Sequence, residues 1–266
     1  MAINQSERAF RAWPVLVQIA QRRETITYGE LGDKLGIHHR AVRYVLGVIQ
    51  DYCLEEKLPP LTILIVNGAG RPGSGFIAYD LCHFEKGLSV VWDFNWQSQK
   101  NPFEFSTSGD SFDSLVIVLA KEPESSEEIY RRVPSRGIKQ LLFRSALLKA
   151  YKHKCAFTEL SFTEALEACH IVPWSLASNA ERLDVRNGML LNSLHHRLFH
   201  RGMITISTQH RIIFFDPKQE EGTYSKFDSM LTSKLHGQKM HLPFKRNQRP
   251  LEEYILRHHQ IAGWEL

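Results

Sequence analysis

The sequence predicts an α+β protein with a helical N-terminal domain and a C-terminal domain built from a β-hairpin and a helix. Three observations predict this fold class: a capped pair of amphipathic helices between residues 27 and 50, two β-rich runs around a Gly- and Pro-rich turn between residues 61 and 80, and closely spaced histidines between residues 169 and 200. The 266 residues, of which 43% are hydrophobic, suffice for one large or two small packed cores.

Two helices are predicted in "ITYGELGDKLGIHHRAVRYVLGVIQDY". Thr27 can cap the first helix with Glu30 reaching back from the third helical position, and Gly36 suits the left-handed residue that ends it. In the second helix the apolar residues between positions 42 and 49 fall on one helical face, which leaves Arg40 and Arg43 on the opposite face.

A β-hairpin is predicted next, in "LTILIVNGAGRPGSGFIAYD", with Arg71 at its tip. Two helices joined at a glycine and followed by a hairpin form the plan of a winged helix-turn-helix, whose second helix can enter the DNA major groove. We therefore predict that Arg40, Arg43 and Arg71 bind DNA. A winged helix used only for packing or dimerisation is the alternative.

This region resembles the helix-turn-helix part of alkyltransferase-like DNA proteins in "TYGELGDKLG", "RAVRYVL" and "LPPLTILIVNGAG". Those alkyltransferases carry a reactive cysteine in a Pro-Cys-His-Arg motif, and this chain has "LPPLTILIV" there, so alkyl transfer is not implied. Farther on, "LSVVWDFNW" and "SFDSLVIVLA" are predicted strands that extend the first domain. The predicted organisation is a winged-helix-like domain over 1–120, a linker over 121–136 and a second domain over 137–266.

Charge and cysteine content narrow the class of partner. The chain has a net charge of +4, and residues 131–154 contain eight Lys and Arg residues and no acidic one, a pattern that suits a polyanion. Arg136, Lys139 and Arg144 are the DNA-binding candidates in this run, with a solvated helix face as the alternative. Four cysteines without a CxxC pair favour a reducing cytoplasm, and without a signal segment or a long apolar run no membrane role is expected.

Chemistry is predicted in the C-terminal half. In "CHIVPW" and "NGMLLNSLHHRLFH", Asn187 follows His170 by 17 residues, His196 follows nine residues later and His200 four residues after that. The segment after Asn187 is predicted to be a helix beginning near Met189. His196 and His200 would then share one helical face with Cβ atoms about 6 Å apart, close enough to hold one metal ion.

This arrangement resembles the HNH endonuclease family, a ββα-metal fold, in "CAFTE" opening the hairpin, "EACHIVPW" on its second strand and "RNGMLLNSLHHRLFHRG" on the helix. The resemblance implies that His170 is the general base and that Asn187 orients it. It also implies His196 as a metal ligand. His200, where many relatives carry aspartate, resembles the second helix histidine of the bacteriocin DNases and would ligate too. Cys169 is either a third ligand or a small buried thiol.

The implied function is metal-dependent hydrolysis of DNA phosphodiester bonds with one divalent ion per active site, Mg²⁺, Mn²⁺, Ni²⁺ or Zn²⁺. Imidazole ligands favour the transition metals. A restriction or defence nuclease fits two DNA-binding parts in one chain, modification dependence is a further alternative, and double-strand cutting favours a homodimer. A non-catalytic DNA-binding regulator and an RNA nuclease or toxin are the rival functions. An intact His170 and Asn187 argue against a mere scaffold.

Overall fold

The computed structural model describes residues 4–133, 135–216 and 224–265. The chain divides into two compact units, each of which has its own core. Unit 1 comprises Met1–Leu115 and Arg132–Leu141, and unit 2 comprises Val116–Arg131 and Leu142–Leu266. The segment 121–136, expected to be a linker, contains the helix α6 and is shared between the two units.

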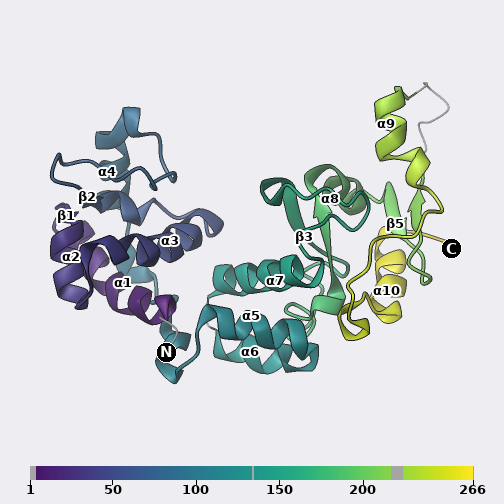
Figure 1. The fold of residues 1–266 in the computed structure, drawn as a ribbon, viewed down its shortest axis with the longest axis horizontal. Helices are drawn as coiled ribbons and strands as arrows, with labels where there is room; N and C mark the ends of the chain where they lie inside the picture. The colour runs from purple at the N-terminus through teal and green to yellow at the C-terminus, as the bar shows by residue number, and fades with distance from the viewer. Residues whose placement is uncertain (1–3, 134, 217–223, 266) are drawn as a thin grey trace. The chain divides into compact units, whose positions relative to one another are not determined.

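Unit 1 is mostly helical. Its long helices α1 and α3 pack on each other with α2 beside them (Figure 1). The core is centred on Trp13, whose ring meets those of Tyr52, Trp96 and Phe103 edge to face. The elements are α1 (Gln5–Gln21), β1 (Ile26–Thr27), α2 (Tyr28–Leu35), α3 (His39–Glu55), β2 (Ile65–Val66), α4 (Phe84–Asp93) and the first part of α5 (Phe112–Lys121).

The predicted helix pair is present. The Thr27 side chain accepts a hydrogen bond from the Glu30 backbone N–H, and the Glu30 carboxylate accepts from the Thr27 N–H, which completes the capping box. Gly36 ends α2 in the left-handed conformation with φ of 66°. The turn is tight: a Cβ at Gly32 would lie 2.8 Å from the backbone oxygen of Ile37. This part of the N-terminal prediction is confirmed.

The predicted wing hairpin is wrong. All residues from 61 to 78 are described, and they hold the 3₁₀ helix Leu61–Leu64, the short strand β2 and a Gly-rich loop. β2 pairs in parallel with β1, the strand before α2, and not with the run that follows the turn. The reason is burial on both sides: residues 61–66 are all buried, so the segment lies inside the unit. Arg71 lies exposed in the loop with its guanidinium over the Phe84 ring.

Two predicted strands are helices. "LSVVWDFNW" overlaps α4, and "SFDSLVIVLA" overlaps α5. In α4 the buried residues recur at helical spacing, because Phe84, Gly87, Leu88 and Val91 line one face. This amphipathic pattern outweighs the β-propensity of the valines, which depends strongly on tertiary context.

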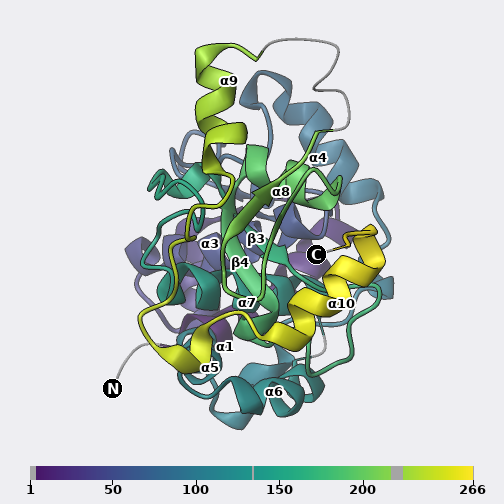
Figure 2. The same cartoon turned by 90° about the vertical axis from the view of Figure 1, so that its right-hand side faces the viewer.

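Unit 2 is built around the antiparallel pair β3–β4, with Cys169 opposite Met189 and His170 opposite Gly188. Figure 2 shows the two strands side by side with α8 following β4. β5 and β6 form a second hairpin. The elements are α6 (Ser126–Arg132), α7 (Arg136–Ala150), β3 (Leu166–His170), β4 (Gly188–Asn192), α8 (Ser193–His200), β5 (Ile204–Ile206), β6 (Ile212–Phe214), α9 (Lys226–Leu231) and α10 (Glu252–Ala262).

The hairpin and its helix begin later than predicted. "CAFTE" lies in a turn before β3, and "EACH" forms the first strand rather than the second. Met189 belongs to β4, and α8 starts at Ser193 with Asn192 as its cap. The misassignment arises because all five residues of β4 are buried, and a short apolar run has no period that distinguishes strand from helix.

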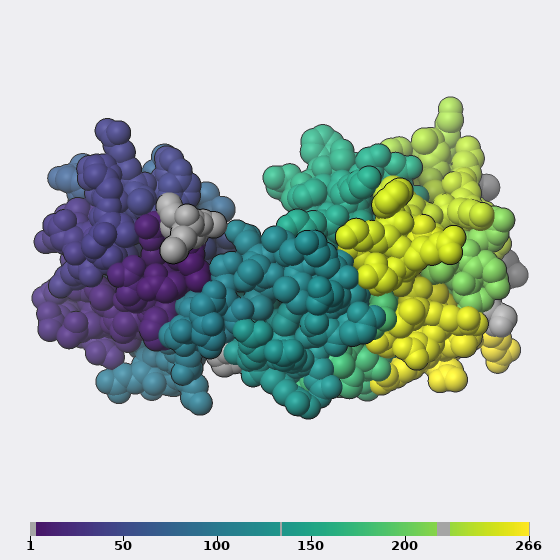
Figure 3. All heavy atoms as spheres, turned by 60° about the horizontal axis from the view of Figure 1, so that its bottom comes forward, coloured from purple at the N-terminus to yellow at the C-terminus, as the bar shows by residue number. Residues whose placement is uncertain are grey.

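The C-terminal segment closes unit 2 by lying against its first helices (Figure 3). Gln248 donates a side-chain hydrogen bond to the carbonyl of Ala120, and Asn247 donates to that of Lys121 at 3.0 Å. Gly188 marks a close approach at the start of β4, since a Cβ there would lie 2.6 Å from Phe143 of α7. None of the described helices combines the length and apolarity needed to span a bilayer.

His258 of α10 gives unit 2 an acid-sensitive contact. Its ring stacks on Phe199 at 4.0 Å, and its buried Nε2 has no hydrogen-bond partner among the described residues. Burial lowers the pKa of His258 to about 4. Because the unfolded state, with a pKa near 6.5, binds the proton first as pH falls, the contact is worth up to about 3 kcal/mol above pH 6.5 and is lost towards pH 4.

His258→Phe keeps the stacking and removes the titration, so its free energy of unfolding should fall less between pH 7 and pH 4.5 than that of the parent chain. Denaturant unfolding followed by fluorescence measures this difference. His153→Asn, which changes an exposed histidine with positive φ, is the control and should keep the parent pH profile. Equal pH profiles for His258→Phe and the parent chain would contradict this account.

Candidate active site

Cys169, His196 and His200 come together where β3 ends beside α8. One ligand atom from each lies within 4.8 Å of the others, and this is the metal-type group found within the described ranges. The two histidines are one helical turn apart, and their Nε2 atoms are 2.9 Å from each other. Cys169 is fully buried while His200 is exposed, so the group has one protected side and one side open to solvent.

The three donors fit a divalent transition metal. Two imidazole nitrogens and one sulfur are the ligand types of zinc and its neighbours, and atoms bonded to one such ion at 2.0–2.3 Å are about 3–4 Å apart. Burial, together with the charge of Glu167, raises the pKa of the Cys169 thiol well above its ordinary value, so this ligand would lose its proton on binding the ion. An open face leaves room for a water or a phosphate oxygen.

Glu167 is a site residue that the sequence prediction missed. Its carboxylate is hydrogen bonded to Nδ1 of His196. Burial alone would raise the pKa of Glu167, but hydrogen bonds from Ser193 and His196 hold it below the ordinary value. An ionised carboxylate can only accept, so His196 carries its proton on Nδ1 and turns an unprotonated Nε2 to the metal group. The available signal was the i, i+2 spacing of Glu167 and Cys169 on one strand face.

Glu167→Gln should lower metal affinity about 10- to 100-fold, because the amide no longer fixes the ring of His196 as a carboxylate does. Calorimetric titration with Zn²⁺ and Mn²⁺ measures the change. Glu164→Gln, three residues earlier and exposed, is the matched control and should bind like the parent chain. Parent-like affinity in Glu167→Gln would show that the carboxylate does not support the ligand.

His170 is held between two aromatic rings at the end of β3. It stacks on Phe143 at 3.9 Å with 12° between the planes, and Trp174 meets it edge to face. Its Nε2 lies 3.0 Å from the backbone oxygen of Arg182. A carbonyl can only accept, so Nε2 carries the proton and Nδ1 keeps a lone pair. Burial lowers the pKa of His170 to about 4, which keeps the ring neutral and able to accept a proton near pH 7.

Asn187 is fully buried and holds the loop between β3 and β4. Its side-chain oxygen accepts from the Val172 N–H at 2.8 Å, and its nitrogen donates to the Glu181 carbonyl at 3.0 Å. The next carbonyl along the chain, that of Arg182, is the one that binds His170. Asn187 therefore acts on the predicted base through the loop backbone and has no direct hydrogen bond to the imidazole.

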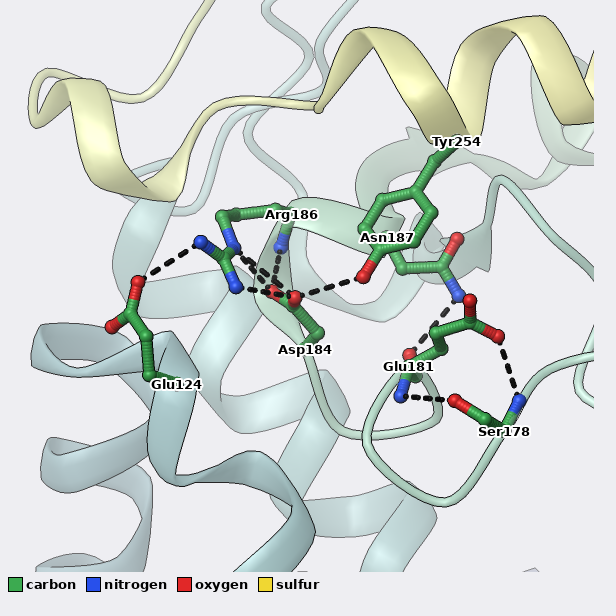
Figure 4. A network of polar contacts seen from close by, with 7 residues as sticks. All are labelled: Glu124, Ser178, Glu181, Asp184, Arg186, Asn187 and Tyr254. Carbon is green, nitrogen blue, oxygen red and sulfur yellow. Dashed lines mark hydrogen bonds and ion pairs between the residues drawn. The ribbon is translucent and has the colours of Figure 1, made fainter.

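Figure 4 shows how α10 secures the same loop. Asp184, which is buried, forms an ion pair with Arg186 at 2.8 Å and accepts a hydrogen bond from the Tyr254 hydroxyl at 3.1 Å. Arg186 also pairs with Glu124 near the start of unit 2. Below this network Glu181 accepts from the Ser178 N–H, which closes the turn ahead of Arg182. The loop carrying the His170 acceptor is thus tied at several points.

The predicted DNA-binding residues fall into two groups. Arg40, Arg43, Arg71 and Arg136 are exposed. Lys139 is only 9% exposed, and the guanidinium of Arg144 donates to the carbonyls of Thr163 and Leu166 at the start of β3. The predicted phosphate contacts of Lys139 and Arg144 are therefore wrong, because one side chain is buried and the other supports the hairpin.

His195, next to the ligand His196, was expected on the surface or against a phosphate, and that expectation is also wrong. It is fully buried, and its Nε2 donates to the Leu231 carbonyl at 2.8 Å. The ring faces the Cys155 side, where hydrogen bonds from His195 and Thr158 outweigh burial and lower the pKa of the Cys155 thiol to about 7. His195 therefore joins α8 to the interior of unit 2.

Residues 155–207 match the model of a protein family described as HNH endonuclease. This range contains β3, β4 and α8, and with them the three metal-type donors and His170. The chain thus contains an HNH endonuclease domain in its C-terminal half, as its motifs predict. An HNH endonuclease domain implies a nucleic acid substrate and nuclease chemistry. No curated protein matches the chain at a significant level.

Proposed function

We propose that this chain is a metal-dependent DNA endonuclease. The observation that carries the proposal is the juxtaposition of a metal-type Cys169–His196–His200 group with a neutral, oriented imidazole one residue from Cys169. A scaffold stabilised by metal would need the three donors but not a second histidine held in one tautomer. The same juxtaposition therefore favours an enzyme over a non-catalytic regulator.

The residues divide the work of phosphodiester hydrolysis. His170 Nδ1 takes the proton of the attacking water, and the Arg182 carbonyl stabilises the imidazolium through Nε2–H. Asn187 keeps that carbonyl in place. Cys169, His196 and His200 would hold the divalent ion, which when bound supplies Lewis-acid stabilisation of charge on the phosphate and the departing 3′-oxygen. Products with 5′-phosphate and 3′-hydroxyl ends are expected.

Unit 1 is proposed to select the DNA. The first half of α3 presents Arg40 and Arg43 to solvent, and neither forms an ion pair within the part of the chain that the structure describes. Two free cations on one helix face suit contact with phosphates or base edges. A selecting unit and a cutting unit in one chain fit a restriction or defence nuclease, acting in the cytoplasm and as a dimer where both strands are cut.

The test is cleavage of supercoiled plasmid, with methylated and unmethylated preparations, single-stranded DNA and RNA as parallel substrates. Mg²⁺, Mn²⁺, Ni²⁺ and Zn²⁺ are supplied in turn, and chelator is the negative control. Metal-dependent nicked or linear plasmid is the expected result. Cleavage of RNA with intact DNA would replace the proposed substrate, and no cleavage with any ion would reject the enzyme.

A further inference from the structure

Unit 1 contains a pocket of about 660 Å³ that the nuclease chemistry does not use. The outward face of α3 forms one wall, the start of α2 a second, and the Gly-rich loop of residues 67–75 a third. All these elements belong to unit 1. The volume falls within the range typical of sites for small organic ligands.

The bottom of the pocket holds a hydrogen-bonding group without a partner. The Thr62 side chain is 3% exposed, and its hydroxyl has no hydrogen bond among the residues described. Gln50, 8% exposed, also lines the pocket and uses only its oxygen, which accepts from the Ile77 N–H at 3.3 Å. A buried polar group left unpaired costs free energy, so a ligand that bonds to Thr62 would recover this cost.

Charge points to the ligand's sign. Arg40, Arg43 and His39 stand on the α3 side of the pocket, and none of the residues that line it is acidic. The loop adds backbone donors, because the N–H groups of Ser74 and Gly75 have no acceptor in the described structure. The pocket is thus rich in donors and carries positive charge at one side, which suits a ligand with a phosphate and several acceptor atoms.

The walls leave space for a flat group. A Cβ added at Gly47, Gly68 or Gly75 would meet no atom within 4 Å, so the backbone there is open to the pocket. The rings of Tyr28 and Phe76 contribute aromatic surface to the same cavity. Open glycine backbone beside aromatic rings accommodates a planar heterocycle, which can stack on the rings and bond at its edge.

We propose that this pocket binds one nucleotide unit, with the base between the glycine loop and α3, an edge atom on Thr62 and the phosphate on Arg40 and Arg43. The unit has two sources: a free nucleotide, or a nucleotide turned out of a DNA duplex. The second source rests on the proposed nuclease function, and the first does not. In both cases the recognising chemistry is the same.

The full-length chain is tested in chelator, so that no DNA is cut. The probes are the four deoxynucleoside monophosphates, measured by calorimetry, and two labelled duplexes, measured by anisotropy. One duplex is fully paired, and the other has a single nucleotide opposite an abasic position, which lowers the cost of turning it out. Gly47→Leu fills the pocket without a predicted clash, and Thr62→Val removes the hydroxyl at constant shape.

Gly47→Leu should weaken binding at least tenfold, and Thr62→Val about two- to tenfold, the range of one hydrogen bond. Tyr44→Leu on the same helix, outside the pocket, is the control and should bind like the parent. Mononucleotide binding that depends on Gly47 identifies a free nucleotide. Preference for the abasic duplex that depends on Gly47 identifies a nucleotide turned out of DNA.

Binding of neither probe, or binding that is indifferent to Gly47→Leu and Thr62→Val, overturns the proposal. Plasmid cleavage of the same preparations is measured separately with metal. A chain that binds mononucleotide through the pocket and cuts no nucleic acid would reject the nuclease function and support the pocket. The two proposals can therefore fail independently.

Discussion

Replacing His170 by alanine is expected to lower DNA cleavage by at least about 100-fold, because proton transfer by a positioned base contributes roughly 10²–10⁴ to such reactions. His170 has no atom in the metal-type group, so metal affinity should stay near that of the parent chain. DNA binding should also persist. Single-turnover cleavage of a labelled duplex, calorimetry and anisotropy measure the three quantities.

His170→Asn serves as a companion variant, since it fills more of the space beside Phe143 and still lacks a base of the right pKa. Both variants should lose cleavage to a similar extent if the imidazole acts chemically. Circular dichroism and thermal unfolding show whether the loss of ring stacking has disturbed the fold. Near-normal cleavage by either folded variant would show that His170 is not the base.

Replacing His196 by alanine should lower metal affinity by at least about 100-fold and abolish cleavage, because it removes the donor that links the other two and is held by Glu167. Leu194→Ala, at an exposed position of the same helix, should leave both properties unchanged. Calorimetric titration with Zn²⁺, Ni²⁺, Mn²⁺ and Mg²⁺ is the measurement. Full metal affinity in His196→Ala would refute the site.

The other two donors set metal preference. His200→Asp should keep activity and shift preference towards Mn²⁺ and Mg²⁺, because a hard oxygen replaces a nitrogen. Cys169→Ala should weaken Zn²⁺ binding more than Mn²⁺ binding if the thiol ligates, since sulfur favours the softer ion. An unchanged Zn²⁺ affinity in Cys169→Ala would leave this thiol as a packing group, the alternative that its complete burial also allows.

The helix pair of unit 1 could be predicted because its signals are local. A capping box and a left-handed glycine act within a few residues, and both occur as expected at Thr27 and Gly36. The wing could not be predicted, because the partner of β2 is a strand 39 residues earlier in the register, Ile26 against Ile65. The valines of α4 and α5 misled for a related reason: their β-propensity is decided by the surface on which they pack.

The site followed the same division. The spacing of His196 and His200 on one helix face is a local property and was predicted. The placement of Cys169 against them depends on the register of β3 with β4, which brings the strand end to the start of α8. The contact of Glu167 with His196 depends on the same register. Lys139 and Arg144 appeared as free charges because composition does not indicate burial or backbone acceptors.

Gly188 allows the reactivity of the site to be attenuated without altering any reactive atom. It lies opposite His170 in the strand register, and a Cβ at this position would be 2.6 Å from the ring of Phe143, the ring on which His170 stacks. Alanine at 188 must therefore displace α7 or the strand start, and the shift would be passed directly to the imidazole. Such a substitution is a rational route to a heat-sensitive form of the nuclease, active at low temperature and silenced on warming.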